Sequence, residues 1–172
     1  VFIPDRPRTG RTYEQKSLQI CFLNIEDETI RVLDIFHGAE NYNPVFAPDD
    51  QSIYFLSNRD GYRNLYSLSL RSGEVFRLTD YFTGISGITA YSPAFSVSAQ
   101  SGDVCYTYYS KSKYSIYIAG PDEFDPLQVG TQDVNFGPGI LPPLSRALDI
   151  VTPFLKQIQF HPSNELDKPD RP

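Results

Sequence analysis

The 172-residue chain is long enough to bury one hydrophobic core, and its 12 tyrosines and 12 phenylalanines favour sheet-rich structure. Its formal net charge of −6 argues against nucleic acid as a partner, because the phosphates would be repelled. No apolar run approaches the ~20 residues of a membrane span, and no basic stretch precedes an apolar segment as in a signal peptide. We therefore expect no membrane insertion and interpret the acidity as favouring solubility.

Residues 1–17 open with the strand-like run Val1–Ile3 and continue as a loop that is rich in proline and arginine. We interpret this loop as solvated rather than as an anion-binding arm, because no aromatic residue is interleaved with the basic ones. Residues 18–36 contain short apolar runs on both sides of the acidic turn Glu26–Glu28. We interpret this turn as solvated rather than as a divalent-cation site.

Residues 43–80 carry the most regular pattern in the chain. Short β-branched and aromatic runs, Ile53–Leu56 and Leu65–Leu70, alternate with the glycine-containing turns Arg59–Gly61 and Arg71–Gly73. The runs are too brief for buried helices, and glycine supplies the positive φ that tight hairpin turns need. The segment predicts four antiparallel strands in a meander, which is the arrangement of one β-propeller blade.

The residues before this segment repeat its second half. A shift of 45 residues aligns five apolar positions in one unbroken register, and these include Leu23 with Leu68 and Ile30 with Val75. The spacing is typical of propeller blades. Residues 18–36 are therefore predicted to form half of a preceding blade.

A third, degenerate copy covers residues 92–129. A shift of 51 aligns Ser115-Ile116-Tyr117 with Asn64-Leu65-Tyr66. The strands of this copy keep their apolar character, although the Arg-Asp-Gly turn is lost. We predict Leu127–Val129 as its short outer strand.

The full repeat resembles the WD40-like (PD40) repeat of the TolB propeller family, which runs roughly F-S-P-D-G, S-x-R-D-G, x-I-Y, G-x-x-x-R-L-T. The matching segments are Phe46–Asp50, Ser57–Gly61, Asn64–Tyr66 and Gly73–Thr79. Asp50 stands where that family usually has glycine, so we expect this turn to differ in backbone type. The resemblance implies non-catalytic envelope proteins of Gram-negative bacteria that bind the peptidoglycan-associated lipoprotein and Tol-system partners. The amino-terminal α/β domain of TolB has no counterpart in this chain.

We predict an all-β fold, a partial β-propeller of about two and a half to three four-stranded antiparallel blades over residues 1–130. A Pro-rich tail follows over residues 131–172; we expect its first half to pack on the blades, with a short helix over Leu144–Val151, and its end from Asn164 to be disordered. Because a propeller needs roughly 4–8 blades to close, the chain cannot complete a ring alone. We expect a piece of a larger propeller, in keeping with the absence of methionine. The alternatives are copies that associate to complete the ring, or a Pro-rich tail that covers an open edge.

Residues that carry chemistry are few. Cys21 and Cys105 fall in strand runs at non-equivalent positions of different repeats, so we expect two buried thiols rather than a disulfide. His37 lies in a linker and His161 precedes a proline, and neither has a nucleophile and a carboxylate arranged around it in the sequence. We therefore predict no catalytic residue, no metal site and no cofactor.

The turn Asn58–Asn64 is the candidate binding segment. Its alternating oxygens faintly resemble a calcium loop, but the later acidic ligand is missing. Arg59 and Asp60 are expected to pair locally, while Tyr62 and Arg63 are residue types enriched at protein interfaces. We predict Arg59, Asp60, Tyr62 and Arg63 as the residues that contact a protein partner.

The predicted function is a non-catalytic protein–protein interaction module in the periplasm or cell envelope, a location taken from the resemblance. The alternative is an accessory propeller of a larger hydrolase of the prolyl-oligopeptidase type, in which the ring restricts substrate access. A downstream segment with G-x-S-x-G would identify that case, and this chain carries none. A lyase or glycan-binding propeller would need histidines, arginines and carboxylates at equivalent places in several blades, which the sequence does not show.

Overall fold

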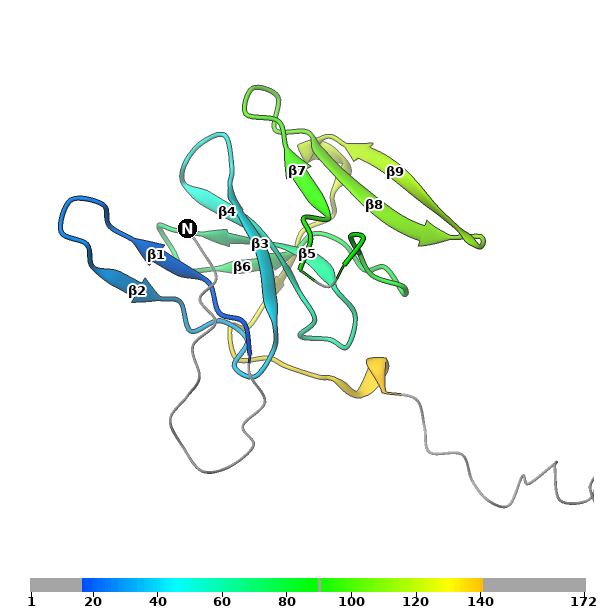
Figure 1. Cartoon of the computed structure of the whole chain (residues 1–172), viewed down its shortest axis with the longest axis horizontal. Coiled ribbons are helices and arrows are strands. Elements are labelled where there is room, and N and C mark those ends of the chain that lie inside the picture. Colours follow the sequence, from blue (N-terminus) through cyan, green and yellow to red (C-terminus); the bar gives the residue numbers. More distant parts are fainter. Residues whose placement is uncertain (1–16, 90, 141–172) are drawn as a thin grey trace, which may run out of the picture. The chain divides into compact units, whose positions relative to one another are not determined.

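The computed structural model describes residues 17–89 and 91–140, and this part of the chain is all-β. Its strands form three separate antiparallel sheets, none of which closes into a barrel (Figure 1). Within these residues the helical elements are two short 3₁₀ turns, η1 (Pro121–Glu123) and η2 (Gly137–Gly139), and no helix is long enough to cross a membrane. The predictions for the loop before residue 17 and for the tail beyond residue 140, including the Leu144–Val151 helix, lie outside the described residues.

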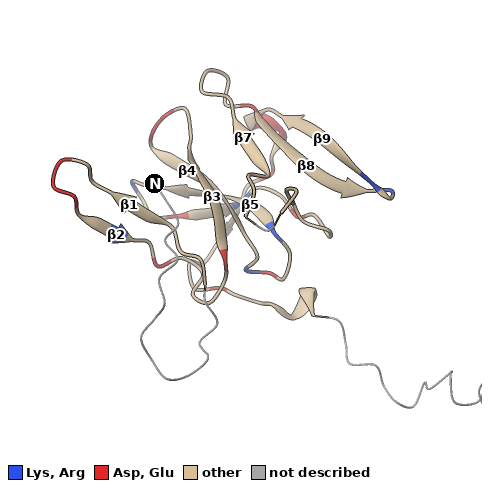
Figure 2. Ribbon diagram, in the orientation of Figure 1, with Lys and Arg blue, Asp and Glu red and all other residues tan. Residues whose placement is uncertain are grey.

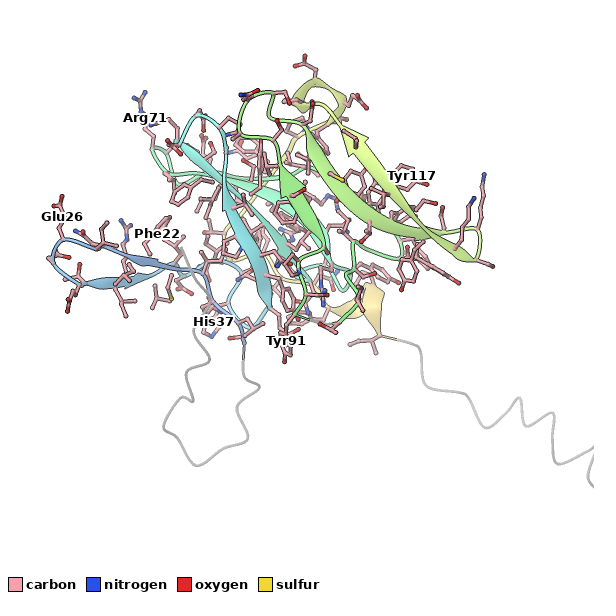
Figure 3. All side chains as sticks on the ribbon, turned by 45° about the horizontal axis from the view of Figure 1, so that its top comes forward. Phe22, Glu26, His37, Arg71, Tyr91 and Tyr117 are labelled. Atoms are coloured by element: carbon pink, nitrogen blue, oxygen red, sulfur yellow. The ribbon has the colours of Figure 1, made fainter. Side chains whose placement is uncertain are left out.

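The first sheet is a hairpin of β1 (Cys21–Leu23) and β2 (Ile30–Val32). Its register places Leu23 opposite Ile30. The turn is closed by its own polar side chains, since the Asp27 carboxylate accepts the backbone N–H of Thr29 at 3.0 Å. The acidic residues thus build an exposed turn, with Glu26 at its tip (Figures 2 and 3).

The second sheet contains the predicted meander, which is confirmed. β3 (Asn41–Phe46), β4 (Ser52–Ser57), β5 (Asn64–Ser69) and β6 (Val75–Arg77) lie in sequence order. Gly61 and Gly73 occupy the two predicted turns with φ of +87° and +74°. Asp50 has a φ of +52°, in the left-handed region that glycine favours, and its side chain adds a cost there.

The third sheet consists of β7 (Phe95–Val97), β8 (Val104–Ser110) and β9 (Lys113–Ala119). A two-residue turn joins β8 to β9, and its residues Lys111 and Ser112 both have positive φ, as a type I′ turn requires. The hairpin therefore forms without the Arg-Asp-Gly sequence found in the second sheet.

The prediction that Leu127–Val129 is the outer strand of the third repeat is wrong. This segment is β10, and it pairs antiparallel with β6 of the second sheet, so β9 remains an edge strand (Figure 1). Two prolines and η1 lie between β9 and β10 and turn the chain away from β9. Val129 then packs against buried residues of the second sheet.

Two clusters of buried side chains hold neighbouring sheets together by apolar contact. The first cluster joins the second sheet to the segments that flank the first hairpin, with Phe22 of β1 packed against it, and the second cluster joins the second and third sheets. The first cluster contains Ile20, Ile35, Phe36, Ala39, Ile53, Phe55, Tyr66, Leu68 and Val75. The second contains Tyr42, Leu56, Leu65, Ile85, Ala94, Phe95, Val104, Tyr106 and Ala119.

No disulfide joins Cys21 and Cys105. Cys21 is buried as expected, whereas Cys105 is half-buried, so the expectation of a buried thiol is wrong for Cys105.

Candidate functional site

The predicted binding turn joins β4 to β5 and packs against residues 131–140 of the same chain. The backbone N–H of Asn135 donates to the carbonyl of Arg59 at 2.6 Å. A Cβ atom on Gly61 would lie 2.3 Å from the backbone nitrogen of Gly139, so two backbones meet there without room for a side chain. Residues 58–63 are all half-buried rather than exposed.

The Asp60 carboxylate contacts side chains of β5 and β6 instead of pairing with its neighbour Arg59. Its Oδ2 accepts the Tyr66 hydroxyl at 2.9 Å and lies 3.4 Å from Nη1 of Arg77. Burial, and then the Asp60 carboxylate, raise the pKa of Tyr66, because both disfavour a phenolate. The expected local Arg59–Asp60 pair is wrong, since the two side chains serve different contacts.

The Arg59 guanidinium lies over aromatic rings. Its Cζ is 5.2 Å from the ring centroid of Phe36 and 6.0 Å from that of Tyr66, a cation–π arrangement. Its Nε and Nη1 are buried without a hydrogen-bond partner among the described residues, and so is Oδ1 of Asp60. Buried donors and acceptors of this kind are the ones that internal water molecules satisfy in proteins.

The other two predicted residues also have partners within the chain. The Tyr62 hydroxyl donates to the carbonyl of Pro138 at 2.6 Å, and its ring lies 5.1 Å from that of Phe82. The Arg63 guanidinium carbon is 4.1 Å from the ring centroid of Tyr42, whose hydroxyl donates to the Glu40 carboxylate. Burial, and then Glu40, raise the pKa of Tyr42 to about 12.

The structure therefore brings all four predicted residues to one turn, but it engages each of them with the chain itself. Their donors, acceptors and rings mainly join β4–β5 to Phe36, Tyr42 and residues 135–139. Because the four residues are half-buried, parts of their side chains stay accessible, and their role in partner binding stays a prediction. The unpartnered apolar surface lies elsewhere.

One open surface is the outward side of the third sheet. Alternate residues of β9 point to opposite faces, and the face that carries Ala119 contributes to the second cluster. The opposite face of β8 and β9 exposes large apolar side chains, with the rings of Tyr109 and Tyr114 only 4.9 Å apart. We call this surface the β8–β9 face; it consists of Tyr109, Tyr114, Ile116 and Ile118.

A second open surface lies on the first sheet. Phe22 packs against the first cluster and contacts the ring of Phe46 at 6.0 Å, so the alternate residues of this hairpin point away from that contact. We call the exposed side the β1–β2 face; it consists of Leu23, Ile30 and Val32.

Sequence reasoning did not identify these faces. β9 carries Tyr114, Ile116 and Ile118 on one side and Lys113, Ser115, Tyr117 and Ala119 on the other, so its pattern alone assigns the core to the side that the structure leaves exposed. The repeat alignment did contain a signal, because it pairs Leu23 and Ile30 with core positions of the second sheet.

His37 is the histidine that the described part of the chain contains. His37 is exposed and lies 3.7 Å from the Asp34 carboxylate, which is three residues away. Across residues 17–89 and 91–140, no group of three or more His, Cys, Asp or Glu side chains is placed to hold a metal ion. His161 lies outside the described residues.

No family model matches the chain, and no curated protein matches it.

Proposed function

We propose that the chain is a non-catalytic protein–protein interaction module of the WD40-like propeller type, acting in the periplasm or cell envelope. Support for the architecture comes from the four-strand meander and from the repeat spacings of 45 and 51 residues on either side of it. The proposed location follows from the resemblance of residues 46–79 to the TolB-type repeat.

The observation that carries the proposal is a difference in burial between equivalent positions of the repeats. In the second sheet the cross-strand pair Leu68 and Val75 is 5% and 0% exposed. In the first sheet the equivalent pair Leu23 and Ile30 is 46% and 45% exposed. The same pattern of residues is thus core in one sheet and surface in the other.

The third sheet shows the same difference in burial, but on the face that corresponds to Leu65 rather than to Leu68. Leu65 is 0% exposed in the second sheet, whereas Ile116, its equivalent, is 73% exposed. Exposed apolar surface of this extent is typical of protein contact sites. None of the residues of the β8–β9 face or the β1–β2 face is charged, so both faces match the uncharged centre of a protein interface.

Site-specific photo-crosslinking in cells that naturally make the protein tests this function. A photoreactive residue at Ile118 or at Leu23 is expected to give a covalent adduct with another protein molecule. The same residue at Ile88, which is fully exposed on a loop, is the matched control and is expected to give none. Absence of protein adducts from both faces would overturn the proposal.

The accessory-propeller alternative gives a different result in the same experiment. If the faces are covered by further sheets of a larger hydrolase, the crosslinks form within one polypeptide that also carries the catalytic domain. Mass spectrometry of the crosslinked peptides separates the two cases.

A further inference from the structure

We propose that the partner of both open faces is a second copy of this chain, bound head to tail. The β8–β9 face of one copy covers the β1–β2 face of the next. This inference rests on the proposed interaction function and names the partner for it.

The chain already makes this type of contact twice within itself. The face of the second sheet that carries Leu68 and Val75 is covered by Phe22 of β1 and by residues that flank the first hairpin, among them Ile20 and Ile35. The face that carries Leu65 is covered from the third sheet, through the second cluster and residues such as Phe95. In each contact, the face of one sheet that carries Leu65 or its aligned residue packs on the face of the next sheet that carries Leu68 or its aligned residue.

The two open faces are the two sides of this same contact. Ile116 aligns with Leu65, so the β8–β9 face is of the type that receives a following sheet. Leu23 and Ile30 align with Leu68 and Val75, so the β1–β2 face is of the type that packs on a preceding sheet. A second copy supplies each face with the kind of surface that covers its equivalent inside the chain.

The chemistry of the two faces fits such a contact. Both faces consist of uncharged apolar or aromatic side chains, whose burial is favourable by roughly 25 cal/mol per Å². The hairpin tips carry charges of opposite sign: Glu26, Asp27 and Glu28 on the first hairpin, and Lys111 and Lys113 on the β8–β9 hairpin (Figure 2). A head-to-tail contact brings the first hairpin of one copy to the β8–β9 hairpin of the next, so it does not place two tips of the same charge together.

A head-to-tail contact uses two different surfaces on each copy, and this makes it testable by complementation. Ile116→Lys disables only the β8–β9 face, and Ile30→Lys disables only the β1–β2 face. An equimolar mixture of the two variants retains one intact contact, between the unaltered β8–β9 face of the Ile30→Lys chain and the unaltered β1–β2 face of the Ile116→Lys chain. A self-paired contact, with one surface used by both copies, is not restored by such mixing.

The experiment is light scattering coupled to size exclusion on the full chain over a range of concentrations. The unaltered chain is expected to reach at least twice its 19.5 kDa mass, and each variant is expected to weaken association by at least about tenfold. The mixture is expected to recover a 1:1 dimer, and the control Ile88→Lys to behave as the unaltered chain. Circular dichroism melting of each variant verifies folding, and Ile118→Lys and Leu23→Lys replace any variant that does not fold.

Three results would overturn the inference: an unaltered chain that stays at 19.5 kDa throughout, variants that associate as the unaltered chain does, or a mixture that stays monomeric. A monomeric chain whose two faces crosslink to a different protein in cells would remove the second copy as partner and leave the proposed function standing. A monomeric chain without any crosslinked protein would remove both.

Discussion

Gly61 and Gly139 approach each other so closely that neither position has room for a Cβ atom. A Cβ on Gly61 would lie 2.3 Å from the nitrogen of Gly139, and a Cβ on Gly139 would lie 2.3 Å from the carbonyl oxygen of Gly61. The contact fixes the β4–β5 turn against residues 135–139, and it leaves the predicted partner residues facing their own chain.

The first prediction concerns this contact. Gly61→Ala is expected to lower the free energy of unfolding by at least about 3 kcal/mol, because alanine there meets both a left-handed backbone and a clash with another backbone. Gly73→Ala is the matched control: its φ of +74° is similar, but nothing lies within 4 Å of its added Cβ. We expect Gly73→Ala to cost only about 1 kcal/mol. Urea unfolding of both variants measures the difference, and equal losses would contradict the contact.

The second prediction compares two carboxylates that pair with the same arginine. Asp60 is largely buried and also accepts the Tyr66 hydroxyl, whereas the Asp80 side chain is 72% exposed and lies 2.9 Å from Arg77. Asp60→Ala is expected to lower the free energy of unfolding by about 2–3 kcal/mol, because it leaves buried donors unpaired. Asp80→Ala is expected to change it by less than about 1 kcal/mol, as for other exposed ion pairs. Chemical denaturation decides, and a larger loss for Asp80→Ala would contradict the assignment of Asp60 as the structural partner.

The third prediction is a loss of stability at alkaline pH. The pKa values of Tyr42, Tyr66 and Tyr106 are all raised in the folded chain, chiefly by burial, from an unfolded value near 10. A raised folded pKa contributes stability that is fully present below pH 10 and is lost as the pH rises through the folded value, which is about 12 for Tyr42. The slope is expected to be roughly 1.4 kcal/mol per pH unit for each tyrosine that ionises only on unfolding.

Denaturation midpoints between pH 9 and about 12 test this, together with tyrosinate absorbance. Tyr42→Phe is the informative variant, because it removes the contribution of Tyr42 to the slope and leaves Tyr66 and Tyr106 in place. Stability that stays flat through this range would show that these hydroxyls are not buried as the structure has them.

The sequence pattern predicted the second sheet well because two of its turns contain glycine where the backbone has positive φ, at Gly61 and Gly73. β3 begins at Asn41, two residues before the predicted repeat at 43–80, since the strand continues through an irregularity near Asn43, whose φ is +48°. The repeat pattern assigned Leu127–Val129 to the wrong neighbouring strand, because a three-residue strand carries too little pattern to specify its partner.

The candidate site shows a different limit of sequence reasoning. Tyr62 and Arg63 are residue types that proteins use at interfaces, but residue type does not show whether the partner is another protein or the same chain. The acceptor of the Tyr62 hydroxyl is Pro138, 76 residues further along the chain. Only the folded backbone brings that carbonyl within 2.6 Å of the hydroxyl.

The last prediction tests whether β10 pairs with β6 rather than with β9. The test follows the backbone amides of β9. The backbone N–H of Thr107 in β8 donates to the carbonyl of Ala94 at 3.2 Å, toward the β7 side. Because backbone groups alternate in direction along a strand, those of Tyr106 and Tyr108 point to β9. Their partners across the hairpin are Tyr117 and Ser115. The amides of Tyr114, Ile116 and Ile118 then point to the outer edge, where the described residues provide no strand.

Amide hydrogen exchange read by NMR is expected to show this alternation along β9. Ser115 and Tyr117 should exchange at least about a hundredfold more slowly than Tyr114, Ile116 and Ile118. The monomeric Ile30→Lys variant is the suitable sample, because in it no second copy covers the strand. Protection of all five amides would mean that a strand pairs with the outer edge of β9, and pairing by Leu127–Val129 would restore the arrangement expected from the repeat. The alternating pattern, with slow exchange at the β10–β6 ladder, would establish that β9 is an edge strand and that β10 has been transferred to the second sheet.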